Sequence, residues 1–221
     1  MSIPVKSQTD LLNRYLIREL EHGIRVSRLC RLIGKAMGLP SQSCYDLSLA
    51  GFLHDVGKLK ISFLPDSRRE QLTIEELRYE RMHAAFGADY LKSCGYPDYI
   101  VSWVRYHHEN CDGSGYPDHL RRGKIPLGSK IIRVSDEFIS LTSERRCRKA
   151  FTQNEAVDMM IAESEYYDLE VFLKFLQIAH TSDLSKLVSE SYELTQERKG
   201  DLIHMFTSPE AERERKENTD G

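Results

Sequence analysis

Apolar residues recur at intervals of three and four along most of this chain, which is the spacing of an amphipathic α-helix. The series that starts at Leu12 continues through Leu16 and Leu20 and reaches Ile33. The sequence Gly38-Leu39-Pro40 then predicts the end of this first helix, because glycine ends helices and proline cannot continue one.

Further helices follow from the same spacing and from capping residues. Thr73-Ile74-Glu75-Glu76 and Thr152-Gln153-Asn154-Glu155 have the pattern of a capping box, and Asp168 is a candidate N-cap. The glycines and the proline of 110–118 predict a loop, as Pro65 does for 60–72. The predicted helices cover about 43–56, 73–95, 97–108 and 126–143, with others after Thr152 and Asp168.

The chain shows neither the strict alternation of a β-strand nor an internal repeat, so the predicted fold class is all-α, a single helical bundle. After about Thr181 an amphipathic and strongly charged segment follows. We expect an N-terminal leader (1–8), one domain (9–180), a helical extension (181–206) and a charged flexible tail (207–221).

Composition narrows the class of protein. Hydrophobic residues make up 40% of the chain and charged residues 29%, as in an ordinary soluble protein. The net charge of −3 gives no overall attraction to nucleic acid or to an anionic membrane. The chain contains no run of 18 apolar residues, so no transmembrane helix is predicted. The N-terminus lacks the apolar core of a signal peptide. Five cysteines without a C-x-x-C pair favour reduced thiols and a cytoplasmic location.

One segment carries most of the candidate chemistry: His107-His108-Glu109-Asn110-Cys111-Asp112-Gly113-Ser114-Gly115-Tyr116-Pro117. Two adjacent imidazoles beside an acid and a Gly-rich turn are typical of a metal site. The doublet His54-Asp55, the single residues His22 and His83, and Asp136 add the nitrogen and oxygen ligands that Fe, Mn or Zn prefer. Alone, His22 or His83 would be an ordinary core or surface histidine; the order and spacing of the whole set favour a metal site.

In these motifs and in their order the chain resembles the HD-GYP family of cyclic-dinucleotide phosphodiesterases, a branch of the HD phosphohydrolases. The resemblance extends from about Glu19 to about Leu173 and implies an HD-type bundle with two metals. By this resemblance the first metal is bound by His22, His54, Asp55 and Asp136, and the second by Asp55, His83, His107 and His108.

Three basic residues are candidates for binding substrate phosphates. Lys58 ends the pattern His54-Asp55-Val56-Gly57-Lys58 and, one helical turn after His54, is predicted to face the same way. An ammonium group there could offset the charge of a phosphate. The resemblance also assigns phosphate binding to Arg145 and Arg148, whose guanidinium groups present a planar fork of donors. The run 145–149 is equally compatible with an exposed charged surface.

The chain departs from the family at two places. Most members have Pro-Tyr where this chain has Arg146-Cys147, so an aromatic residue beside the site is missing. Many members have a glutamate that binds a third metal one turn before the first histidine, where this chain has Arg18. A cation there would repel a third ion. We therefore expect two divalent ions, iron or manganese from the nitrogen and oxygen ligands.

The resemblance implies a metal-dependent phosphodiesterase that hydrolyses cyclic di-GMP to the linear dinucleotide or GMP. Asp55 would hold a hydroxide that bridges the two metals, and Lys58 would assist. Two alternatives stay open: an HD hydrolase of a mononucleotide or of mixed cyclic GMP-AMP, and a catalytically weak cyclic di-GMP sensor that signals through 181–221. A diguanylate cyclase domain is a candidate partner for the Gly-Tyr-Pro loop.

Overall fold

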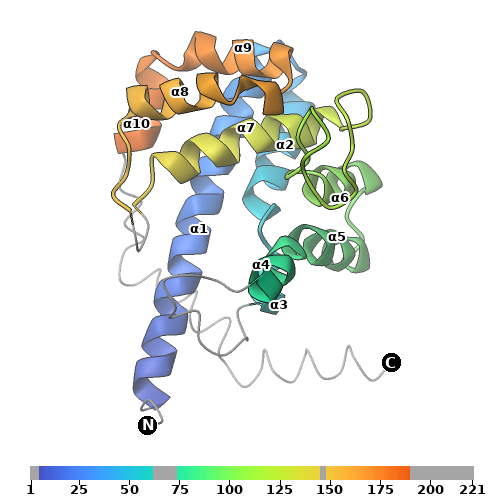
Figure 1. Ribbon diagram of the computed structural model, residues 1–221, viewed down its shortest axis with the longest axis vertical. Helices are drawn as coiled ribbons and strands as arrows, with labels where there is room; N and C mark the ends of the chain where they lie inside the picture. Colours follow the sequence, from blue (N-terminus) through green and yellow to red (C-terminus); the bar gives the residue numbers. More distant parts are fainter. Residues whose placement is uncertain (1–4, 62–73, 145–147, 190–221) are drawn as a thin grey trace. The chain divides into compact units, whose positions relative to one another are not determined.

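The structure is a computed structural model that describes residues 5–61, 74–144 and 148–189 (Figure 1). Within these ranges the chain forms helices and no β-strand, which confirms the predicted all-α class. Two compact units are distinguished, residues 1–21 with 191–221, and residues 22–190. In the first unit the described part is the start of the first helix; the second unit contains the bundle.

The helices of the described ranges follow one another with short connections. Their bounds are α1 Val5–Ala36, α2 Ser41–Leu53, α3 Lys58–Ile61, α4 Ile74–Arg81, α5 His83–Ser93, α6 Asp98–Arg105, α7 Leu127–Leu141, α8 Gln153–Ala162, the short 3₁₀ helix η1 Ser164–Tyr166, α9 Leu169–Ile178 and α10 Ser182–Ser189. None of these helices is long and apolar enough to span a membrane.

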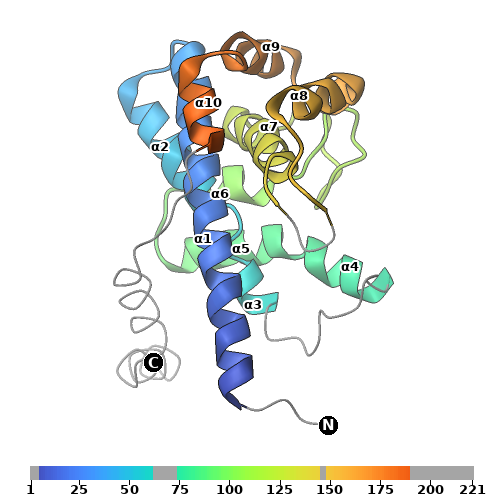
Figure 2. The same cartoon turned by 90° about the vertical axis from the view of Figure 1, so that its left-hand side faces the viewer.

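Helix α7 is the central element of the bundle, since it packs against α2, α6, α8 and α9. Its buried face presents Ile131, Ile132, Phe138 and Ile139 to a hydrophobic core to which α1, α2, α5, α6 and α8 to α10 also contribute. In Figure 1 and, after a quarter turn, in Figure 2, α8 and α9 lie at one end of the bundle and α3 and α4 toward the other.

Helix α10 lies in the predicted extension 181–206. Its residues Leu184 and Leu187 are buried in the same hydrophobic core as α7 to α9. The amphipathic pattern there thus reflects packing against the bundle, as far as residue 189. The four segment boundaries predicted from the sequence stay predictions, and residues 190–221 lie outside the described part.

Most helix termini follow the sequence signals. Gly38 has a φ of +74° just after α1, as a glycine that ends a helix does. Both halves of the capping box form at Thr152 and Glu155, and Asp168 caps α9 by accepting from the backbone N–H groups of Glu170 and Val171. The capping box predicted at Thr73 lies outside the described residues.

Three predicted helices end or break earlier than expected. The helix predicted for 43–56 ends at Leu53, the one for 73–95 is interrupted at Met82, and the one for 97–108 ends at Arg105. A histidine stands within two residues of each interruption, and its ring Nδ1 donates a hydrogen bond to the carbonyl three residues earlier. This bond draws the side chain back over the last helical turn and favours a tight turn.

The turn between α2 and α3 lies directly against α5. A Cβ added to Gly57 would meet the carbonyl oxygen of His83 and the amide nitrogen of Gly87 at 2.0 and 2.5 Å, closer than any carbon atom can approach. Glycine is therefore required at 57, because only a residue without a side chain allows two backbones to come this close. This contact fixes the distance between the turn 54–57 and the start of α5.

We predict that Gly57→Ala lowers the free energy of unfolding by about 1–3 kcal/mol, since the new methyl group forces the turn away from α5. Denaturant unfolding followed by circular dichroism measures the change. Gly123→Ala is the matched control, because a Cβ at Gly123 meets nothing within 4 Å. Equal stability of the two variants would contradict the close-packing argument.

Candidate metal centre

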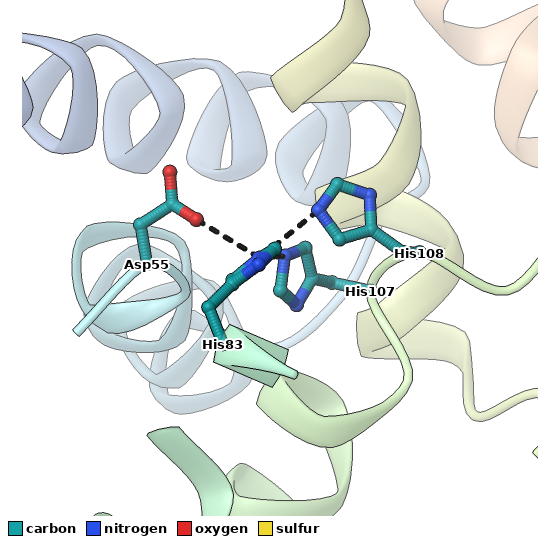
Figure 3. A group of neighbouring side chains, drawn as sticks. All are labelled: Asp55, His83, His107 and His108. Carbon is teal, nitrogen blue, oxygen red and sulfur yellow. Dashed lines mark hydrogen bonds and ion pairs between the residues drawn. The ribbon is translucent and has the colours of Figure 1, made fainter. Parts of the chain in front are cut away.

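Side-chain nitrogen and oxygen atoms of seven residues converge in two groups within the bundle. In each group one candidate ligand atom per residue lies within 4.8 Å of the others. Figure 3 shows the second group, with the three imidazole rings directed toward one another and toward the carboxylate. The first group is His22, His54 and Asp136; the second is Asp55, His83, His107 and His108.

Five elements that are distant in the sequence supply these residues. His22 lies in α1, and His54 and Asp55 lie in the turn after α2. His83 is the first residue of α5, His107 and His108 follow α6, and Asp136 lies in α7. All seven residues singled out from the sequence are thus close together in space.

Three of the histidines are anchored in the same way. His54, His83 and His107 each form a hydrogen bond from Nδ1 to the backbone carbonyl of the residue three positions earlier, at 2.7, 2.6 and 2.6 Å. A carbonyl only accepts, so Nδ1 must carry the proton. In a neutral ring the lone pair is then on Nε2, the atom that faces the cluster.

The Nε2 atoms are so close that they need a positive charge between them. His83 Nε2 lies 3.3 Å from His107 Nε2 and 3.1 Å from His108 Nε2. Because His83 and His107 both carry the proton on Nδ1, their lone pairs repel each other at this distance when both rings are neutral. In addition, the buried atoms His54 Nε2 and Asp55 Oδ1 have no hydrogen-bond partner in the described structure. Convergent buried acceptors without donors are what a divalent cation requires, so these residues fit a metal.

Asp55 stands between the two groups. Its Oδ1 lies 3.2 Å from His83 Nε2, while Oδ2 lies 3.2 Å from His54 Nε2 and 3.9 Å from His22 Nε2. One carboxylate oxygen therefore faces each group. Burial favours the neutral acid, but the charges of His54 and Lys58 outweigh it and hold the pKa of Asp55 well below its usual value.

Lys58 contacts Asp55 and does not lie on the same helix as the turn of His54. It is the first residue of α3, a separate helix, and its Nζ lies 2.6 Å from Asp55 Oδ2. The prediction that Lys58 faces the same way as His54 assumed a continuous helix, and the break after Leu53 removes that argument. The ammonium group nevertheless reaches the same cluster, with 26% of the side chain exposed.

Asp136 is held in the first group by hydrogen bonds. Its Oδ1 lies 2.9 Å from His22 Nε2, and Ser140 Oγ donates to the same oxygen at 3.3 Å. Burial raises the pKa of Asp136, but the hydrogen bonds and charges of His22 and His54 reverse this and hold it well below its usual value. The carboxylate is therefore ionised at neutral pH.

His54 differs in its pKa from the three histidines of the second group. Burial, together with His54 and His83, lowers the pKa of His107 to about 3, and the pKa values of His83 and His108 are also lowered. These rings are neutral and can donate electron pairs. Burial acts in the same direction on His54, but Asp55 and Asp136 raise its pKa to about 10. The position of His54 near both carboxylates thus favours the protonated, positively charged form of its ring.

The loop after His108 folds back on the cluster. Glu109 is buried, and its carboxylate accepts from the backbone N–H groups of Asp118 at 2.7 Å and Leu120 at 2.9 Å. A single side chain at the start of the loop thus holds the end of the loop in place. The sequence drew attention to Glu109 only as an acid near two histidines.

Tyr116 completes this arrangement. Its backbone N–H donates to the carbonyl of His108 at 3.1 Å, and its ring stacks on the His108 ring with 4.7 Å between centroids. A Cβ on Gly115 would lie 2.3 Å from the amide nitrogen of Asn110. The glycine permits the loop to close, which agrees with the loop predicted for 110–118 from its glycines and proline. Arg81, missed in the sequence, lies over the outer face of Tyr116.

Of the two arginines predicted to bind phosphate, Arg145 lies outside the described residues. Arg148 donates to the backbone carbonyls of Ser140 and Leu141, at 2.9 and 3.1 Å, and lies over the ring of Phe151. Its guanidinium thus binds the carbonyl end of α7. The predicted role in substrate binding stays a prediction.

Residues 6–171 match a family model described as HD domain. A cyclic di-GMP phosphodiesterase of Pseudomonas aeruginosa is 30% identical over 76% of this chain and 41% of that protein. A 3'3'-cGAMP-specific phosphodiesterase of Vibrio cholerae is 31% identical over 63% and 32%, and a cyclic di-GMP phosphodiesterase response regulator of Xanthomonas campestris is 33% identical over 63% and 37%. The chain spans less than half the length of these relatives.

Solved structures share the fold. A protein from Bdellovibrio bacteriovorus described as an HDG"Y"P protein has a TM-score of 0.60 at 19% identity, covering 72% of this chain and 52% of that one. A cyclic GMP-AMP specific phosphodiesterase of Vibrio cholerae has a TM-score of 0.58 at 17% identity, covering 82% and 48%. The curated relatives and the family model confirm the resemblance to the HD-GYP branch. Because the HD domain model matches most of the chain, the chain belongs to the HD domain family.

Proposed function

We propose that this chain is a metal-dependent phosphodiesterase that hydrolyses cyclic di-GMP. The observation that carries the proposal is the pair of ligand groups with the Asp55 carboxylate between them, one oxygen directed at each. Two divalent ions held a few ångströms apart clamp both the attacking and the departing oxygen of a phosphodiester. The names of the curated relatives support the same chemistry.

In this proposal His22, His54 and Asp136 bind the first ion, and His83, His107 and His108 bind the second, with Asp55 shared. The described geometry supports the assignment because the candidate ligand atoms of each group lie within 4.8 Å of one another, and each group includes one buried atom without a hydrogen-bond partner. Iron or manganese is the metal we propose, since both accept mixed imidazole and carboxylate ligands and leave positions open for water and substrate.

The protein side chains would act on the charge and position of the substrate. Asp55, ionised and buried, holds the two ions at a fixed separation. Lys58 lies beside Asp55 and is partly exposed, so its ammonium group can turn to a phosphate oxygen and offset the negative charge that develops on it. Arg145 and Arg148 are proposed to bind the phosphates of the dinucleotide.

The curated relatives divide between cyclic di-GMP and 3'3'-cGAMP in their names. Both are cyclic dinucleotides with two phosphodiester bonds, so they share the chemistry proposed here. We propose cyclic di-GMP, a cytoplasmic location, and a diguanylate cyclase domain as a candidate partner of the Gly-Tyr-Pro loop. The cysteines at 30, 44, 94 and 111 are free thiols, which agrees with a reducing compartment.

Asp55→Ala is expected to abolish hydrolysis of cyclic di-GMP and to lower the content of both metals, because this one carboxylate serves both ions. Turnover of cyclic di-GMP by anaerobically purified protein is measured by chromatography of the nucleotides. Turnover of 3'3'-cGAMP is measured in parallel. His180→Ala is the control, since this histidine is exposed and distant in sequence from every predicted ligand. A variant with full metal and full activity would refute the assignment.

We predict two metal ions per chain. Arg18 lies in α1 one helical turn before His22, where the resemblance to the HD-GYP family implies a glutamate in many members. A guanidinium cannot bind a cation and repels one. Elemental analysis of the purified protein should therefore give about two equivalents of iron or manganese. Three fully occupied sites in a diffraction experiment at the metal absorption edge would show that this prediction is wrong.

Arg148→Ala is predicted to raise the KM for cyclic di-GMP and leave the metal content unchanged. Loss of one charged hydrogen bond to a phosphate costs about 1.5–3 kcal/mol, or roughly 10–100-fold in KM. Steady-state kinetics and thermal denaturation are compared with those of Lys149→Ala, its exposed neighbour. A lower melting temperature with unchanged KM would assign Arg148 to the end of α7 alone.

A further inference from the structure

Arg133 of α7 is a cation inside the bundle that the proposed chemistry does not use. Its side chain is only 13% exposed, and its Nη1 lies 2.6 Å from Glu137 Oε2. Its Nε donates to Asn110 Oδ1 at 3.1 Å, and its guanidinium lies 5.5 Å from the centre of the Tyr167 ring. A buried guanidinium is stable only where its charge and donors are satisfied. Each of these partners is therefore required.

Asn110 is the partner of interest, because it stands two residues after His108. Its Nδ2 donates to Ser114 Oγ at 2.9 Å, and Ser114 in turn donates to Asp112 Oδ1 from both its hydroxyl and its backbone N–H. A continuous set of hydrogen bonds thus runs from Arg133 into the first half of the loop. Glu109 holds the second half.

Arg133 therefore links two structural elements, α7 and the loop next to His108, that each carry residues of one ligand group. It lies on α7 one turn before Asp136, which belongs to the first group, and it holds the loop that carries His108 of the second. We infer that Arg133 is a positioning residue that fixes this loop against α7 and so holds His108 of the second group in place relative to Asp136 of the first. The part of this inference that concerns metals rests on the two-ion proposal above.

Lys130 provides a matched control on the same helix. It lies one turn before Arg133, its side chain is 16% exposed, and it also forms a partly buried ion pair, with Asp168 Oδ2 at 2.9 Å. Asp168 is the N-cap of α9 and not part of the loop. Removing either cation breaks an ion pair on α7, but only Arg133 is bonded to the loop.

Hydrogen–deuterium exchange of the metal-free protein tests the positioning itself. Arg133→Met and Asn110→Ala should speed exchange of the amides of Gly113 and Tyr116, which donate to backbone carbonyls within the loop. Lys130→Met should not. Asn110→Ala leaves the ion pair of Arg133 with Glu137 in place, so it can be measured even where Arg133→Met fails to fold. It also removes the bond to Ser114, and Ser114→Ala, which keeps the bond of Arg133 to Asn110, should therefore change exchange less. Unchanged exchange in Asn110→Ala would overturn the inference.

Titration calorimetry with Mn²⁺ tests the consequence for the metals. Wild-type protein should bind two ions, and Arg133→Met and Asn110→Ala should each weaken one of them by about tenfold, the lower end of the range for residues behind a ligand. The double variant should lose less than the sum of the two single ones, because both break the bond between Arg133 and Asn110.

The outcomes separate the two proposals. Wild-type protein that binds fewer than two Mn²⁺ ions refutes the two-ion proposal, while the exchange data still decide whether Arg133 positions the loop. Two ions bound with wild-type affinity by Asn110→Ala refute the link between the loop and the metals. An equal loss in Lys130→Met would show a general effect of destabilising α7 and would also refute it.

Discussion

The hydrogen bond from Nδ1 of each buried histidine to the carbonyl three residues earlier determines much of this structure. It fixes the proton on Nδ1, so the lone pair of His54, His83 and His107 faces the interior. It also occupies a carbonyl in the last turn of the preceding segment, and the helices end or break there. The same bond therefore orients the rings and creates the turns from which they project.

Such an arrangement is unfavourable without a cation. The Nε2 atoms of His83 and His107 lie only 3.3 Å apart, and His54 Nε2 and Asp55 Oδ1 are buried without a hydrogen-bond partner in the described structure. Buried polar atoms without partners destabilise a fold. The stability must come from elsewhere in the bundle, where α7, α8 and α9 bury a continuous apolar core with no part in the site. A stable core that is separate from the functional site is common where the site carries strain that the surrounding structure sustains.

Much of this organisation could be predicted from the sequence. The three- and four-residue spacing of apolar residues gave the all-α class, and the capping residues at Thr152 and Asp168 marked true helix starts. The seven candidate ligands could be chosen because their motifs and their order resemble those of the HD-GYP family. The helix ends at Leu53 and Arg105 could not be predicted, since they depend on side-chain bonds to the backbone that periodicity does not contain. Arg133 was missed for a related reason: its partner Asn110 is 23 residues away, and a single charged residue on a helix normally faces solvent.

The contact of Gly57 with α5 bears on how such a site can change over time. At Gly57 no side chain stands between the turn that carries Asp55 and the helix that begins with His83. Their separation is thus a property of two backbones, and a change of rotamer cannot alter it. Substitutions at the surrounding rim can accumulate without disturbing that separation. A family with this contact can therefore diverge in the nucleotide it recognises while the spacing of its reactive centre is inherited unchanged.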